Sequence, residues 1–304
     1  MGLKNTQKGH SEVYFGDYRD YWWNRDYLDL IAERLGLERH RKLLDVGCGL
    51  CHWSKLLVNY LAASAHVVGL DNDEKWTQKN NKVRKHFQEL GARFELINGD
   101  AHKLPFEDNS FDLVTCQTVL IHVKKPKKVI KEMKRVLKPG GTILCVEPNN
   151  LVQNLMKSSL SDGNTIDEVL DHVKFALICE KGKKKLGMGD SSLGDLVPGM
   201  LAEAGFDEVE VCLSDKAIPM YPPYERQEQV ATLKQWGNTT HPDLQPESDY
   251  KYFEAFGGRY LDFYENYQKK YQGAGEDFLN SLVHQQYHAA GGAVMYIVSG
   301  TKPE

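Results

Sequence analysis

Residues 42–53 read KLLDVGCGLCHW, an apolar run that leads through Gly47 and Gly49 into a helical pattern. Glycine lets the backbone approach a ligand closely, and the start of a helix offers free N–H groups. The stretch therefore predicts a nucleotide-binding turn between a strand and a helix. It does not match the dinucleotide fingerprint G-x-G-x-x-G, which would need a glycine at His52.

Short apolar runs alternate with helical patterns from about residue 42 onward, which is typical of a parallel α/β sheet. We expect strands at 42–46, 66–70, 93–97, 111–116, 142–147, 209–213 and 293–299. We expect helices at 53–62, 74–90, 126–137 and 191–204, with a turn at Pro139-Gly140-Gly141. The sequence therefore predicts a Rossmann-like α/β fold with a seven-stranded, mostly parallel sheet and helices on both faces.

The segments outside this pattern define the expected domain organisation. Residues 1–41 are predicted to be an N-terminal helical cap, with one helix over 18–35 that carries Tyr21, Trp22 and Trp23. The core is expected at 42–214 together with 291–304, and a lysine-rich loop is expected at 181–185.

Residues 215–290 form the third expected part, a helical insertion before the last strand. Aromatic residues recur at three- and four-residue steps between Phe253 and Tyr271, which predicts one helical stripe that Gly257-Gly258 weakens or bends. The stripe either builds a substrate lid or packs as ordinary core. We expect the last strand to pair antiparallel with 209–213, so that the insertion joins two edge strands.

Three aspartates follow three successive predicted strands. Asp45 lies just before the glycine turn, where it would repel a pyrophosphate but can hold a cationic amino group. Asp71 can accept hydrogen bonds from ribose hydroxyls, and Asp100 beside the small Ala101 suits an adenine ring. This ordered set favours S-adenosylmethionine (SAM) over NAD as the cofactor. The alternative is that each aspartate only caps the helix after it.

Several segments resemble the class I SAM-dependent methyltransferases, and among them the type 11 subfamily, which includes ubiquinone and menaquinone biosynthesis enzymes. They are LLDVGCG, VVGLD, NGDAHKLPF, FDLVTCQTVLIHV, VLKPGG and MLAEAGF. The resemblance covers about residues 19–213 and 293–301 and leaves 215–290 unmatched.

This resemblance implies a role for each matching position. Gly47 and Gly49 would line the methionine part of SAM, Asp71 the ribose, Asp100 with Ala101 the adenine, and Gln117 the region near the sulfonium. Cys48 and Asn72 complete the expected cofactor contacts. The chain departs from the family at Cys51, where a third glycine is common.

Methyl transfer from SAM needs mainly positioning, and a base where the acceptor carries a proton. His122 and Glu147 are the candidate catalytic residues because both follow strands at the expected mouth of the sheet, although His122 can also be structural. We expect in-line transfer to a small, partly apolar metabolite. The alternatives are methylation of a macromolecule such as tRNA or protein, and SAM binding without catalysis.

Composition limits the partners. A net charge of −4 argues against a large nucleic-acid surface, and the lysines at 124–138 surround an apolar stripe, so we read them as a solvated helix face. The first residues lack an apolar leader pattern and no stretch is long and apolar enough for a membrane, so we expect a cytoplasmic protein. A homodimer stays open.

The six cysteines are expected to be reduced and mostly buried. Residues 48–52 match C-x-x-C-H, the haem attachment pattern that also contains the redox pair C-x-x-C. Their place between a strand and a helix favours the nucleotide turn over either role. We predict no metal site.

Overall fold

The computed structural model describes residues 17–77, 81–240 and 249–304. They divide into two compact units. The core unit comprises residues 24–154, 183–215 and 293–304, and the helical unit comprises the described residues up to 23 together with 155–182 and 216–292. Residues 1–16 of the expected N-terminal cap lie outside the described part of the chain.

The core unit contains a sheet that has seven strands in the described residues, in the order β3-β2-β1-β4-β5-β7-β6. The strands are β1 Lys42–Val46, β2 His66–Asp71, β3 Arg93–Asn98, β4 Phe111–Gln117, β5 Leu137–Asn149, β6 Asp207–Leu213 and β7 Val294–Thr301. The first five run parallel to one another, and β7 is antiparallel to both β5 and β6. The predicted fold class, a mostly parallel seven-stranded sheet with a helical insertion before the last strand, is confirmed.

The position of β7 corrects one expectation. It pairs antiparallel with β6 as predicted, but it lies between β5 and β6 and so is no edge strand. Ile297 and Val298 in its middle are 3% and 0% exposed. A strand that is this apolar is stable where neighbours cover it, because an exposed apolar edge would invite pairing with other chains.

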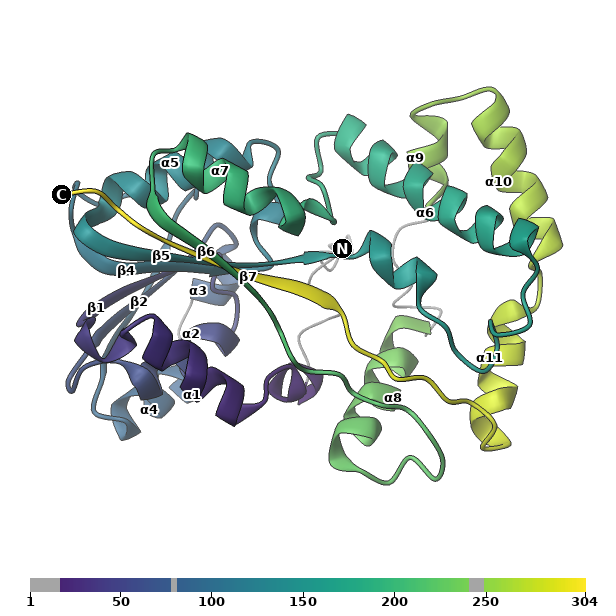
Figure 1. Ribbon diagram of the computed structural model, residues 1–304, viewed down its shortest axis with the longest axis horizontal. Helices are drawn as coiled ribbons and strands as arrows, with labels where there is room; N and C mark the ends of the chain where they lie inside the picture. The colour runs from purple at the N-terminus through teal and green to yellow at the C-terminus, as the bar shows by residue number, and fades with distance from the viewer. Residues whose placement is uncertain (1–16, 78–80, 241–248) are drawn as a thin grey trace, which may run out of the picture. The chain divides into compact units, whose positions relative to one another are not determined.

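The helices of the core unit cover both faces of the sheet. Figure 1 shows α5 and α7 on one face and α1, α2 and α4 on the other. Their bounds are α1 Arg25–Arg34, α2 His52–Leu57, α3 Glu74–Thr77, α4 Asn81–Glu89, α5 Pro126–Val136 and α7 Val197–Glu203, with 3-10 helices η3 Leu37–Arg39, η4 Val58–Tyr60, η5 Leu120–His122, η6 Leu151–Leu155 (which ends at the unit boundary) and η7 Leu193–Leu196. The apolar stripe of the lysine-rich helix is fully buried at Val129, Ile130, Met133 and Val136, which agrees with a solvated lysine face.

The expected single helix over 18–35 is wrong. A short 3-10 helix, η2 Asp17–Tyr21, precedes α1, and the two are separated by residues 22–24. Asn24 has extended backbone, with φ −82° and ψ 136°, and stands at the N-cap of α1. An N-cap residue leaves the helical conformation by definition, so the helix starts anew after it.

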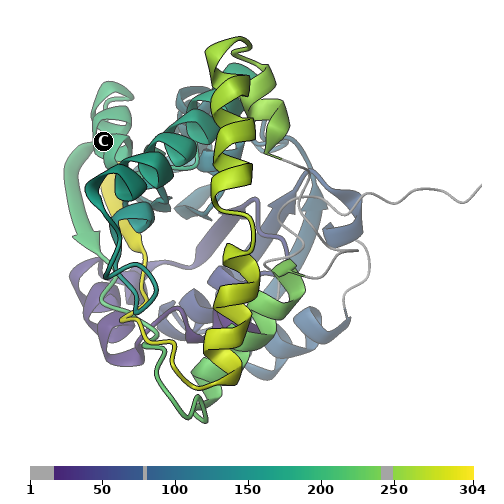
Figure 2. The same ribbon diagram turned by 90° about the vertical axis from the view of Figure 1, so that its right-hand side faces the viewer.

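The helical unit contains η2, most of α6 Ile166–Lys185, α8 Gln227–Thr240, α9 Tyr250–Glu254, α10 Arg259–Lys270 and α11 Ala274–Val283. Figure 2 shows α10 and α11 following one another along this unit. The lysine-rich loop expected at 181–185 is wrong, because these residues form the last turns of α6. Gly182 lies so close to Tyr252 that an added Cβ would be 2.5 Å from its carbonyl oxygen, so close packing holds this end of the helix.

Aromatic packing joins α6 to the following helices. The Phe175 ring stacks on Tyr267 with a centroid distance of 4.3 Å and lies 4.8 Å from the fully buried Phe253. The expected single stripe is divided between α9 and α10, because Gly257 and Gly258 adopt φ of +66° and +48° between the helices. The aromatic side chains therefore bury much of their surface within the helical unit itself.

Candidate functional site

The carboxyl ends of the parallel strands bring the predicted cofactor residues to one edge of the sheet. Asp45 pairs with Gly69 across β1 and β2, and Asp71 pairs with Asn98 across β2 and β3. Gln117 ends β4 opposite Val146 on β5. Because parallel strands end at the same edge, residues scattered over about a hundred positions meet there.

The glycine turn after β1 depends on left-handed backbone. Gly47 and Gly49 have φ of +69° and +49°, and an added Cβ on Gly47 would lie 2.6 Å from Cγ2 of Val119. Cys51, where the resembled family often has glycine, also adopts φ of +59° and stands at the N-cap of α2. Cys51 thus adopts the left-handed backbone conformation that a glycine would adopt at this position.

Backbone hydrogen bonds fix this turn to β2. The N–H groups of Gly47 and Cys48 both donate to the Leu70 carbonyl, at 2.7 and 3.0 Å.

The Cys48 and Cys51 thiols are both buried and free, which agrees with the expected reduced cysteines. A hydrogen bond with Cys51 and burial raise the pKa of Cys48 well above its ordinary value, so the Cys48 thiol lacks the thiolate character of redox sites.

Asp71 connects two parts of the site. Its Oδ2 accepts from the Gly49 N–H at 2.9 Å, and its Oδ1 accepts from the Asp73 N–H at 3.0 Å. Burial raises the pKa of Asp71, while these backbone bonds oppose the shift. The Asn98 amide fixes the backbone beside it by donating to the carbonyls of Asp71 and Asn72.

Several buried polar atoms beside the glycine turn have no hydrogen-bond partner among the described residues, among them Asp45 Oδ2, Gln117 Nε2 and Ser54 Oγ. Asp45, Gln117 and Ser54 are only 2%, 8% and 0% exposed. Burial raises the pKa of Asp45 to about 7, and Ser54 partly offsets that shift. Buried polar groups are rarely left unpaired, so an orphaned acceptor and an orphaned donor indicate a polar ligand.

The alternative that each aspartate only caps the helix after it does not hold for Asp100, because no helix directly follows it. The N-cap of α2 is Cys51, which makes no side-chain cap bond, and Asp45 interacts with the first turn of this helix through Ser54. Asp100 Oδ1 accepts from the His102 N–H and contacts its ring Nδ1, both at 2.8 Å, and these contacts hold the pKa of Asp100 below its ordinary value. The Asp100 side chain is otherwise 64% exposed, and Ala101 beside it is half-buried.

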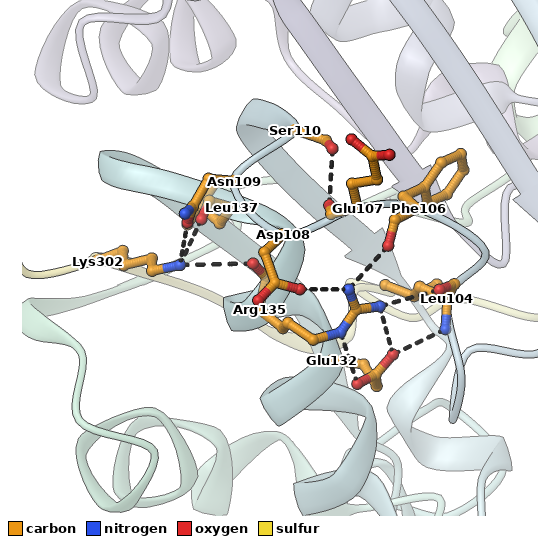
Figure 3. Close-up of polar contacts among 10 residues, drawn as sticks. All are labelled: Leu104, Phe106, Glu107, Asp108, Asn109, Ser110, Glu132, Arg135, Leu137 and Lys302. Atoms are coloured by element: carbon orange, nitrogen blue, oxygen red, sulfur yellow. Dashed lines mark hydrogen bonds and ion pairs between the residues drawn. The ribbon is translucent and has the colours of Figure 1, made fainter.

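The loop after Asp100 is held by α5, as Figure 3 shows. Arg135 donates to the carbonyls of Leu104 and Phe106 at 2.9 and 2.8 Å, and to the carboxylate of Asp108 at 2.8 Å. Glu132, three residues before Arg135, accepts from the Leu104 N–H at 2.9 Å and from the guanidinium. Sequence reasoning missed both residues; the signal was a Glu and an Arg at i,i+3 spacing among lysines.

Glu147 and His122 occupy different environments. Glu147 is 0% exposed, and its carboxylate accepts from the N–H groups of residues 119, 120 and 121. Burial raises its pKa to about 7, and these backbone bonds oppose the shift. His122 is exposed at the end of η5. Their predicted catalytic roles stay predictions.

The described residues also contain a cavity of about 840 Å³ at the opposite edge of the sheet. It is lined near the amino-terminal ends of the parallel strands, by Arg39, His40, Asp112 and Lys138 among others. None of the predicted cofactor residues lines it. Among the described residues, no group of three His, Cys, Asp or Glu side chains is placed to hold a metal ion.

Residues 44–145 match a family model described as Methyltransferase domain. The match runs from the middle of β1 through the glycine turn, Asp71, Asp100 and Gln117 into β5. This segment is a class I SAM-dependent methyltransferase domain. The resemblance inferred from the sequence is thereby confirmed for the methyltransferase domain.

Demethylmenaquinone methyltransferases are among the matched relatives. The protein of that name from Staphylococcus haemolyticus is 40% identical over 116 residues, which cover 38% of this chain and 47% of the relative. The one from Geobacillus sp. is 37% identical over 125 residues, 41% of this chain and 51% of the relative. The chain spans about half the length of the curated relatives that it matches.

The YcgJ protein from Bacillus subtilis is among the similar solved structures. It superposes with a TM-score of 0.50 at 17% sequence identity, over 92% of this chain and 100% of that chain. At this identity the likeness shows the fold alone. No helix in the described part of the chain has the length and apolar character needed to cross a bilayer.

Proposed function

We propose that this protein is an enzyme that moves a methyl group from SAM to a small, partly apolar metabolite. The observation that carries the proposal is the pair of orphaned buried atoms, Asp45 Oδ2 and Gln117 Nε2, beside the glycine turn of a methyltransferase domain. The relatives are named for demethylmenaquinone, and we propose a quinone-type acceptor for this chain as well.

The polar groups present fit the parts of SAM. Asp45 supplies an acceptor for the ammonium group, and Gln117 supplies a donor for the carboxylate. Asp71 has one backbone bond on each carboxylate oxygen, and since a carboxylate has about four lone-pair sites, it keeps capacity for two ribose hydroxyls. Asp100, with Oδ1 occupied by His102, keeps Oδ2 for an adenine amino group.

The cofactor when bound supplies a methyl group that is already activated for in-line displacement, so the protein has to orient the two reactants. The glycine turn and the three aspartates would hold the cofactor end. His122, exposed on η5, is the candidate to take a proton from a hydroxyl acceptor. A neutral imidazole can accept that proton near pH 7.

We further propose that the helical unit determines which acceptor is methylated. Its clustered tyrosines combine apolar ring faces with hydrogen-bonding hydroxyls, a combination that suits an aromatic acceptor. The methyltransferase domain match covers residues 44–145, so this unit lies outside the matched segment.

The direct test uses the full chain. Calorimetry should show one-to-one binding of SAM and of S-adenosylhomocysteine, and weaker or no binding of NAD. Methyl-labelled SAM, incubated with a panel of reduced quinones that have an open ring position or hydroxyl, should yield a labelled quinone. Preferential NAD binding would overturn the cofactor assignment. Normal SAM binding with no labelled product from any quinone would overturn the acceptor class alone.

A further inference from the structure

The Glu147 carboxylate lies at the end of β5 with no exposed surface and several donors around it. Its Oε1 accepts from the N–H groups of Val119 and Leu120 at 2.9 and 2.8 Å, and its Oε2 accepts from Ile121 at 3.4 Å. The Cys116 thiol also contacts Oε1, at 3.6 Å. A buried carboxylate is costly unless hydrogen-bonded, and here both of its oxygens are occupied.

These bonds hold a loop that the chain would not adopt easily. Thr118, directly after β4, has φ of +54°, which is unfavourable for a β-branched residue. The three donors that follow it are the first N–H groups of the turn that becomes η5. A carboxylate at such a turn satisfies groups that have no partner inside the helix. Glu147 therefore stabilises the conformation of residues 117–122.

The same loop touches the cofactor turn. The Val119 side chain lies against Gly47, where an added Cβ would be 2.6 Å from Cγ2. Gln117, whose amide nitrogen is one of the orphaned buried atoms, begins the loop, and His122 ends it. A shift of the loop would therefore move a proposed SAM contact, the packing on the glycine turn and the candidate base together.

We propose that Glu147 is a positioning residue that locks loop 117–122 against the Gly47 turn and so sets the affinity for SAM. The inference rests on the proposed function. It replaces a role as proton acceptor: a base has to reach the acceptor, whereas Glu147 is fully buried and hydrogen-bonded to backbone.

The test compares full-length wild type with E147Q, E147L and the control E203Q. Glutamine keeps one carbonyl acceptor for the loop and leucine keeps none, while Glu203 is an exposed residue on α7 that pairs with Lys127. Two quantities are measured without any methyl acceptor: hydrogen exchange of the amides of residues 119–121, and calorimetric affinity for S-adenosylhomocysteine.

We expect amide exchange in the loop to quicken at least tenfold in E147Q and affinity for S-adenosylhomocysteine to fall at least threefold, with E203Q like wild type. E147L should show larger changes; if it fails to fold, E147Q carries the test. Unchanged exchange and affinity in E147Q, with or without slower methyl transfer, would overturn the inference. Absence of S-adenosylhomocysteine binding by wild type would instead overturn the proposed function, and the affinity part of this inference with it.

Discussion

The Asp71 carboxylate accepts a 2.9 Å hydrogen bond from the Gly49 backbone N–H, which joins the end of β2 to the turn that follows β1. The bond spans 22 positions of sequence. It holds the glycine turn at the carboxylate that we propose to bind the cofactor ribose, so one side chain serves the turn and the ligand. A substitution of Asp71 is therefore expected to disturb both the turn and the proposed ribose contact.

Substitution D71N should weaken SAM binding at least tenfold. Hydrogen bonds to charged groups contribute about 1.5–3 kcal/mol, and an amide replaces one acceptor oxygen by a donor that faces other donors. Calorimetry measures the effect. The matched control is D73N, since the Asp73 side chain is 42% exposed and pairs with Lys75 at 2.7 Å. Equal affinities in the two variants would contradict a ribose role for Asp71.

The affinity for SAM should rise with pH between about 6 and 8. Burial raises the pKa of Asp45 to about 7, and an ammonium group binds its ionised form, so binding below pH 7 must first release a proton. Titration at several pH values should show this slope in wild type and a flat profile in D45N. Glu147 titrates in the same range, and a slope that persists in D45N would assign it to that group instead.

The ionisation of Asp45 should lower the stability of the unliganded protein as pH rises, whereas it raises the affinity for SAM. A carboxyl whose folded pKa is raised stabilises the fold while protonated, so its contribution is lost as pH rises from about 4, its ordinary value, through 7. D45N keeps a neutral side chain and should lose less unfolding free energy over this window. Urea denaturation at pH 5 and 8 measures the difference; equal losses in both proteins would contradict it.

Substitution R135Q should loosen the loop that follows Asp100. Three of the groups that Arg135 binds lie in residues 104–108, and the side chain is only 30% exposed. We expect a loss of about 1–2 kcal/mol in unfolding free energy, discounted for partial exposure, and weaker SAM binding. The control is K131Q, an exposed lysine on the same helix. If both variants behave alike, the Arg135 contacts do not support the cofactor loop.

Substitution Y267F tests the helical unit. The Tyr267 hydroxyl lies 2.6 Å from His172 Nδ1, and its loss should cost about 1 kcal/mol of stability. If this unit determines acceptor choice, the ratio of rates with two quinone acceptors should change while SAM affinity stays constant. The control is Y260F, because within the described residues the Tyr260 hydroxyl accepts one hydrogen bond, from its neighbour Arg259. A stability change with unaltered selectivity would make the cluster purely structural.

Much of the fold followed from sequence pattern, because strand burial and helix periodicity are local properties. The start of β1 at Lys42 and its end at Val46 agree with the prediction, and the other parallel strands differ mainly at their ends. No helix was predicted over the residues of α6, because its apolar residues do not keep to one face. The turn expected at Pro139-Gly140-Gly141 is wrong, because β5 begins at Leu137 through a bulged pairing with β4 and runs through these residues. Those features depend on packing partners that lie far away in sequence.

The sequence by itself determined the succession of strands and turns along the chain, the glycine turn at Gly47, and the acidic residues at strand ends. Each of these follows from neighbouring residues. Only the tertiary structure decided that β7 inserts between β5 and β6, that Arg135 donates hydrogen bonds to the loop after Asp100, and that Glu147 accepts from three backbone N–H groups and is shielded from solvent. The physical reason is that these hydrogen bonds and buried contacts join residues about thirty positions or more apart. The local sequence pattern does not show which distant polar groups will be buried together.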